Sequence, residues 1–135
     1  MMTLSELKET FEMFPDWMDR YGVIIDLGKA LPEAAPDLHQ PCYKVQGCMS
    51  QVWVRARLED GRMHYEGDSD AAIVRGLIAV LLMALSGQTP KAICAFDLEA
   101  QFAALGLAAN LSPNRRNGFY SMVGVMKQAA REALT

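Results

Sequence analysis

The chain has 135 residues, of which 51% are hydrophobic and 21% are charged, and its formal net charge is −3. A chain of this length buries roughly two-thirds of its unfolded surface, so residues 1–135 can fold as a single domain without a disulfide or a metal. Acidic and basic residues are mixed along the chain, which argues against a nucleic-acid-binding protein.

The longest apolar run, residues 71–85, contains Arg75 and is shorter than the ~20 residues that span a bilayer, so we expect no membrane segment. The first residues lack the basic-then-apolar order of a secretory signal, and the three cysteines are an odd number. We therefore expect a cytoplasmic protein with reduced thiols.

Two helices are predicted at the N-terminal end. A capping box at residues 3–6 begins the first helix, and Pro15 ends it. Asp16 caps a second helix that runs to about Gly28. The apolar residues expected to face inward are Leu7, Phe11, Phe14, Trp17, Tyr21, Ile24 and Ile25. Residues 30–43 contain three prolines, which predicts an ordered loop and no regular element.

A β-hairpin is predicted after this loop. Apolar and polar residues alternate over residues 50–58, and Asp60 with Gly61 forms a strong type I′ turn signal. The expected cross-strand pairs are Leu58 with Met63, Arg57 with His64, Ala56 with Tyr65 and Arg55 with Glu66. Because apolar residues face apolar ones and Arg55 faces an acid, this register is self-consistent.

Helices are predicted for the rest of the chain. Residues 68–70 offer cap side chains and negative charge to a helix over residues 71–87, which is apolar nearly all round and should be central. Two short helices begin at Thr89 and Asp97, and the last helix begins at Ser112. The last helix carries an apolar stripe of Phe119, Met122, Val123, Met126, Ala130 and Leu134. The element order indicates an α+β fold, in which helices pack on a small antiparallel sheet.

Cys48 is the first candidate for chemistry. It lies in the stretch VQGCMSQVW, between Gly47, which permits a sharp turn, and the start of the predicted strand. Such a turn tends to expose a side chain, and a thiolate is a strong nucleophile. A free thiol has a pKa of about 8.5, so only a small fraction is ionised at neutral pH. On these residues alone, a packed cysteine and a reactive one are equal alternatives.

Other thiol chemistries have weaker support. A structural metal site needs about four ligands, and Cys42, Cys48 and His39 have no evident fourth, so we predict no metal site. A hydrolase is disfavoured because neither histidine has an evident orienting partner. A disulfide between Cys42 and Cys48 would make a redox switch, and we keep this as the alternative function.

Arg115 and Arg116 lie in the first turn of the last helix, where positive charge opposes the helix dipole. The penalty is only some tenths of a kcal/mol for each residue. Tolerated surface charge and contact with an anion or a partner are equal alternatives for this pair.

Five blocks of the sequence resemble the SufE/CsdE family of sulfur-acceptor proteins. They are RYGVIIDLGKALP at 20–32, VQGCMSQVWV at 45–54, GDSDAAIVRGLIAVLL at 67–82, TP at 89–90 and LSPNRRNG at 111–118. The second and third blocks are highly specific when they occur together in this order and spacing. The resemblance covers nearly the whole chain, and it implies an α+β fold similar to the IscU scaffold.

The resemblance also implies a function. Members of the family take sulfane sulfur from a pyridoxal-phosphate cysteine desulfurase of the SufS or CsdA type and pass it toward iron–sulfur cluster assembly, to a SufB-type scaffold or another sulfur acceptor. The family's acceptor cysteine corresponds to Cys48. Its aspartate and arginine, implicated in setting the acceptor loop and contacting the desulfurase, correspond to Asp70 and Arg115. We therefore expect a sulfur carrier that activates a desulfurase, with no stand-alone catalysis and no cofactor on this chain, since pyridoxal phosphate belongs to the partner.

In the implied mechanism, the Cys48 thiolate attacks the outer sulfur of the desulfurase persulfide, and the loop swings on a hinge at Gly47. Three residues near the thiol depart from the family pattern. Met49 stands where glutamine is usual, Tyr43 stands where asparagine is usual, and Cys42 is extra. Whether the chain forms a homodimer is left open by the sequence.

Overall fold

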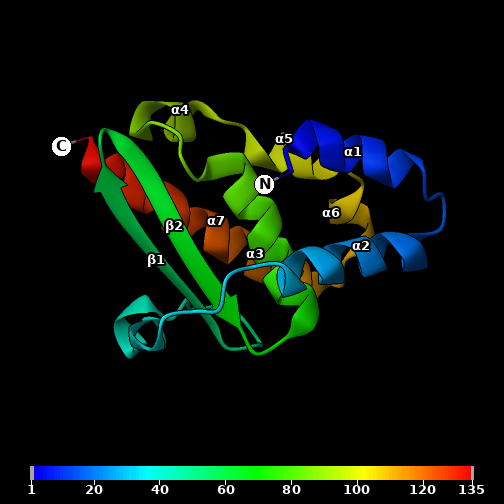
Figure 1. The fold of residues 1–135 in the computed structure, drawn as a ribbon, viewed down its shortest axis with the longest axis horizontal. Helices are drawn as coiled ribbons and strands as arrows, with labels where there is room; N and C mark the ends of the chain where they lie inside the picture. The colour runs from blue at the N-terminus through cyan, green and yellow to red at the C-terminus, as the bar shows by residue number, and fades with distance from the viewer. Residues whose placement is uncertain (1, 135) are drawn as a thin grey trace.

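Seven α-helices and a two-stranded antiparallel sheet build the computed structural model, which describes residues 2–134. The elements are α1 (Leu4–Glu12), α2 (Trp17–Lys29), β1 (Val52–Glu59), β2 (Arg62–Ser69), α3 (Ala72–Leu85), α4 (Pro90–Ala95), α5 (Leu98–Ala104), α6 (Leu107–Asn110) and α7 (Pro113–Ala133). The hairpin lies on one side of α3 and α7, and α1, α2, α5 and α6 lie on the other (Figure 1). This arrangement confirms the predicted α+β class.

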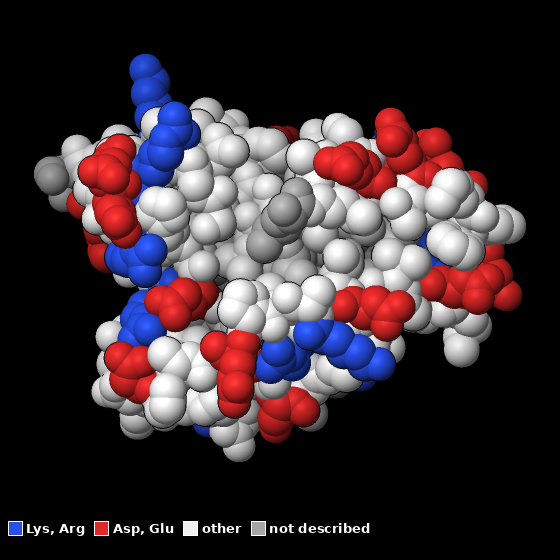
Figure 2. All heavy atoms as spheres, in the orientation of Figure 1, with Lys and Arg blue, Asp and Glu red and all other residues white. Residues whose placement is uncertain are grey.

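The surface carries charges of both signs. On the face drawn in Figure 2, acidic and basic side chains are interspersed around uncharged areas. Within residues 2–134, no helix is both long enough and apolar enough to cross a membrane.

The first two helices begin where side chains cap them. Thr3 and Glu6 exchange the two hydrogen bonds of a capping box, each 3.2 Å long. The Asp16 carboxylate accepts a hydrogen bond of 2.9 Å from the backbone N–H of Met18, which starts α2 as predicted. The inward placement of Phe14 was wrong. This side chain is 37% exposed because α1 ends two residues before it.

The segment before the hairpin is a loop for most of its length, but the expectation that it has no regular element was wrong. It contains two short 3-10 helices, Pro36–Leu38 and Pro41–Tyr43, each of which begins with proline. The hairpin then has the predicted register, with Arg55 opposite Glu66 and two hydrogen bonds of 3.1 Å between their side chains. Asp60 has φ of 52° and Gly61 has φ of 75°, the positive values that a type I′ turn requires.

The central helix is α3, in which ten of 14 residues are buried. The expectation that residues 68–70 cap it was wrong, because its N-cap is Ala71, which provides no side-chain cap. Asp68 and Ser69 instead end β2 and are buried. The Asp68 carboxylate accepts a hydrogen bond from Arg75, one turn into α3, whereas the Ser69 hydroxyl accepts a local one of 3.2 Å from the backbone N–H of Ala71.

Helices α2 and α3 cross with their backbones in contact. A Cβ added to Gly76 would lie 2.1 Å from the backbone oxygen of Ile24, and one added to Gly28 would lie 2.6 Å from the backbone nitrogen of Gly76. Glycine is therefore required on both helices at this crossing. The crossing fixes the N-terminal half of α3, which carries residues of the candidate site.

The C-terminal helices follow the predicted caps. Thr89, Asp97 and Ser112 each accept a hydrogen bond from the backbone three residues ahead. A short helix, α6, interrupts the connection to α7 and was not predicted. The apolar stripe of α7 is buried as expected, except that Leu134 is 56% exposed because it lies at the C-cap, beyond the last turn of the helix.

Candidate functional site

The loop that carries Cys48 is fixed at both ends. At its start, the backbone N–H of Val45 donates to the oxygen of Val52 at 2.8 Å. At its end, the backbone N–H of Gln51 donates to the Asp70 carboxylate at 3.1 Å, and the N–H of Asp70 donates to the oxygen of Gln51 at 3.3 Å. This reciprocal pair places Asp70 at the loop's end and not at the thiol. The segment between these anchors, residues 46–50, presents Cys48.

Gly47 gives the loop its turn. Its φ is 85°, in the left-handed region that favours glycine, and an added Cβ would lie 2.9 Å from the hydroxyl oxygen of Ser121 on α7. The loop therefore lies close against α7 at the residue before the thiol. This agrees with the predicted turn at Gly47, whereas its role as a hinge stays a prediction.

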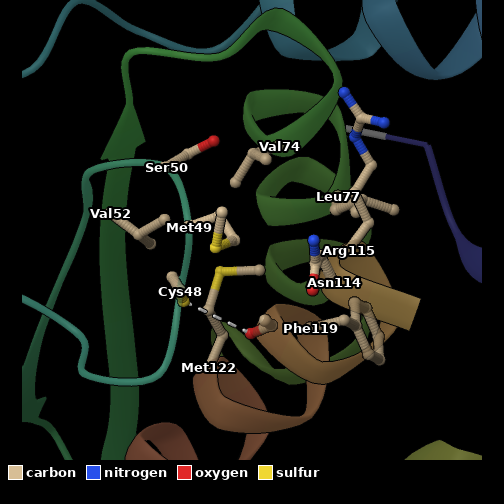
Figure 3. Close-up of a pocket in the computed structure, with 11 residues that line it drawn as sticks. Cys48, Met49, Ser50, Val52, Val74, Leu77, Asn114, Arg115, Phe119 and Met122 are labelled. Carbon is tan, nitrogen blue, oxygen red and sulfur yellow. Dashed lines mark hydrogen bonds between the residues drawn. The ribbon is translucent and has the colours of Figure 1, made fainter. Parts of the chain in front are cut away.

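Cys48 is half-buried between its loop and α7. Its Sγ lies 3.7 Å from the carbonyl oxygen of Gly118, and a Cβ on Gly118 would lie 3.5 Å from the same sulfur (Figure 3). The thiol faces a cavity of about 30 Å³ that is mostly apolar. The lining residues are Cys48, Met49, Ser50, Val52, Val74, Leu77, Asn114, Arg115, Gly118, Phe119 and Met122.

Burial raises the pKa of the Cys48 thiol, because the thiolate would lose hydration in this apolar setting. The protonated thiol is therefore favoured at neutral pH in the arrangement seen here. The two alternatives for Cys48 are thus not exclusive, since the thiol is packed against α7 and also lies on a loop whose backbone is hydrogen-bonded at its two ends.

We expect alkylation of Cys48 by iodoacetamide to rise with pH about a midpoint above the ~8.5 of a free cysteine. The folded pKa lies above the unfolded one, so this thiol's contribution to stability is present at low pH and is lost as pH rises through the folded pKa. Peptide mass spectrometry after timed alkylation measures the midpoint. Alkylation of the exposed Cys42 in the same sample shows that the reagent is active. A midpoint equal to that of the unfolded chain would contradict the burial argument.

The two arginines at the start of α7 have different environments. The Arg116 guanidinium is half-buried and donates to the backbone oxygen of Ala108 at 2.9 Å, so it ties α7 to α6. Arg115 is exposed and lines the Cys48 cavity. Its guanidinium has no hydrogen-bonding or ionic partner among residues 2–134. Of the pair, Arg115 is thus the one available to an incoming group.

A polar network around the buried Asp68 carboxylate was not predicted, and it gives His39 an orienting partner that the sequence did not show. Asp68 is only 7% exposed, and it accepts hydrogen bonds from Arg75 and, at 2.6 Å, from Nε2 of His39. The ring of His39 packs on Trp53 with centroids 4.3 Å apart. The network joins the proline-rich loop, the hairpin and α3. Its one sequence signal was the pair of aspartates at positions 68 and 70, which shortly precede the apolar run of residues 71–85.

Cys42 lies apart from the cavity. It is exposed and lines a wider groove of about 670 Å³ along β1 and α7, which shares no lining residue with the Cys48 cavity. The thiols of Cys42, Cys48 and Cys94 are all free. In the part of the chain that the structure describes, no three His, Cys, Asp or Glu side chains form a group that could hold a metal ion.

The chain is similar to known proteins over nearly its whole length. The SufE family model, described as an Fe-S metabolism associated domain, matches residues 5–130. The chain belongs to the SufE family. A SufE-like protein of Rhizobium etli is 44% identical over 97% of this chain and 91% of its own length. SufE-like proteins of Synechocystis sp. (41%; 94% of this chain and 79% of its own length) and Rhizobium meliloti (39%; 99% of each) are also similar.

A solved structure has the same fold. The solution structure of a hypothetical protein from Thermus thermophilus is similar, with a TM-score of 0.78, 22% identity and 98% coverage of both chains. The family model and the SufE-like relatives confirm the predicted resemblance, and this SufE-family chain is associated with iron–sulfur metabolism.

Proposed function

We propose that this SufE-family protein accepts sulfane sulfur on Cys48 from a cytoplasmic cysteine desulfurase of the SufS or CsdA type. It thereby stimulates the desulfurase and passes the sulfur toward iron–sulfur cluster assembly on a SufB-type scaffold. The observation that carries the proposal is the position of Cys48, which lies in the middle of a loop that is anchored at both ends over a small apolar cavity.

The transfer is a displacement at sulfur. The Cys48 thiol loses its proton to solvent, and the thiolate attacks the outer sulfur of the desulfurase cysteine persulfide. A new S–S bond forms on Cys48, the old S–S bond breaks, and the desulfurase cysteine leaves as a thiolate. No net oxidation or reduction occurs. Pyridoxal phosphate belongs to the desulfurase, where it supplies the chemistry that frees sulfur from cysteine.

The burial of Cys48 requires a movement before this step. A thiol whose pKa is raised by burial is a poor nucleophile at neutral pH, and the Cys48 sulfur is half-buried against Gly118 of α7, which leaves little room for a partner's persulfide. Outward movement of residues 46–50 about Gly47 would hydrate the thiol, which lowers its pKa, and would expose the sulfur to the partner's persulfide. Asp70 keeps the far end of the loop in place, and Arg115 at the cavity mouth contacts the desulfurase.

Mass spectrometry after mixing the protein with a SufS-type desulfurase and L-cysteine tests the proposal. We expect the Cys48 peptide to gain the mass of one sulfur atom, and we expect the Cys42→Ser variant to gain it equally. The alternative redox switch instead predicts loss of two hydrogen atoms and a crosslink between Cys42 and Cys48. A Cys48 peptide of unchanged mass would rule out sulfur acceptance at this residue.

A further inference from the structure

A second groove, of about 480 Å³, lies next to the Cys48 cavity, and Arg115 lines both. It opens where α2, the start of α3 and the junction of α6 with α7 meet. The residues that line it are Met18, Tyr21, Ile25, Ile73, Asn110, Leu111, Ser112 and Arg115. In Figure 3 the side chain of Arg115 extends away from Cys48, so its charge is carried toward this neighbouring surface.

Hydrogen bonds hold the elements around the groove in place. The hydroxyl of Tyr21 donates to the backbone oxygen of Asn110, and the Asn110 side chain donates to the oxygen of Gly106 at 2.8 Å. These bonds tie α2 to the segment that leads into α7, so the groove exists before a partner binds. A preformed pocket loses less entropy on binding than one that must be ordered.

The side chains that line the groove are mostly apolar, and one of them is charged. Of the described residues that line it, Arg115 is the one charged residue. Met18 is 73% exposed at the rim of the groove, where a partner can reach it. Methionine adapts its shape to a partner, and exposed methionines are common at binding surfaces. The groove therefore suits an apolar side chain that is accompanied by a carboxylate.

We propose that this groove is the second half of the surface on which the cysteine desulfurase docks. The inference rests on the proposed function. A partner that reaches Cys48 must cover the cavity mouth, and a stable interface takes about 800 Å² from each protein, far more than that mouth supplies. The surface that continues from the mouth through Arg115 is this groove, whereas the wider groove along β1 shares no residue with the cavity.

The docked arrangement follows from these contacts. An apolar side chain of the desulfurase fills the groove against Met18 and Ile73, and a neighbouring carboxylate pairs with the otherwise unpaired Arg115. The Cys48 loop then lies beside the contact and is free to move toward the enzyme's persulfide. In this arrangement the groove binds the desulfurase, and the loop carries the Cys48 thiol that accepts the sulfur.

A matched pair of variants tests the inference. Met18→Lys places a positive charge in the groove beside Arg115, and Met13→Lys places the same charge on a methionine that is 70% exposed and does not line the groove. We expect Met18→Lys to raise the Kd for the desulfurase about tenfold or more, because the substitution removes an apolar anchor from the interface. Isothermal titration calorimetry measures this Kd. Met13→Lys should leave the Kd unchanged, and Arg115→Ala should raise it.

Sulfur acceptance separates this inference from the function on which it rests. At saturating desulfurase, Met18→Lys should still load Cys48 with one sulfur atom as completely as the wild type. A Met18→Lys variant that binds with wild-type affinity overturns the docking surface and leaves Cys48 as the acceptor. A wild-type protein whose Cys48 takes no sulfur overturns both proposals. If sedimentation shows a wild-type dimer that Met18→Lys dissociates, the groove belongs to a second copy and the inference is wrong.

Discussion

The Cys48→Ser variant is expected to abolish sulfur acceptance and to return the desulfurase to its basal rate. A serine hydroxyl does not ionise at neutral pH and does not attack a persulfide sulfur. The fold should persist, because serine is nearly isosteric and the contact that Cys48 makes with Gly118 is long, at 3.7 Å. We expect the free energy of unfolding to change by about 1 kcal/mol or less.

Sulfide release in the presence of a reductant measures the rate, and calorimetric binding to the desulfurase shows whether docking survives. The Cys42→Ser and Cys94→Ser variants are matched controls, since they remove a free thiol outside the Cys48 cavity. Both should stimulate the desulfurase as the wild type does. Full stimulation by Cys48→Ser would show that the acceptor is another group.

The Gly76→Ala variant should show the largest loss of stability among single methyl additions. Its Cβ would lie 2.1 Å from the backbone oxygen of Ile24, so α2 and α3 must separate. Overpacking of this kind costs about 3 kcal/mol. The Gly22→Ala control adds a methyl to α2 where nothing lies within 4 Å, and it should stabilise the protein by ~0.5–1 kcal/mol.

Denaturation in urea, followed by circular dichroism, gives both free energies of unfolding. Equal effects of the two substitutions would contradict a close helix crossing. Because Val74 and Leu77 on α3 line the Cys48 cavity, Gly76→Ala should also speed alkylation of Cys48 in the folded protein. Gly22→Ala should leave that rate unchanged.

Features set by neighbouring residues were predictable from the sequence. The register of the hairpin follows from alternation and from the turn at Asp60 and Gly61, and the caps at Thr3, Asp16 and Ser112 each act within three residues. These features depend on residues that are close together in the chain, so they do not require the tertiary packing to be known and can be predicted from the sequence.

Features set by distant residues were not predictable in this way. Residues 68–70 have the composition of a helix cap, yet Asp68 is bound by Arg75 and His39, and Asp70 is bound by Gln51. The burial of Cys48 depends on Gly118, 70 residues further along the chain. The family resemblance identified the thiol, whereas its cavity and the groove beyond Arg115 exist only once the helices are packed.

The anchored loop limits how far sulfur can be handed across. Cys48 lies three residues from Val45 and three from Gln51, the two positions that hold the loop. An extended chain spans at most about 3.5 Å per residue, so the Cys48 backbone stays within roughly 10 Å of each anchor while both hold. The loop is thus a short tether. A donor cysteine must come inside that radius, which makes close approach of the desulfurase a geometric condition for transfer.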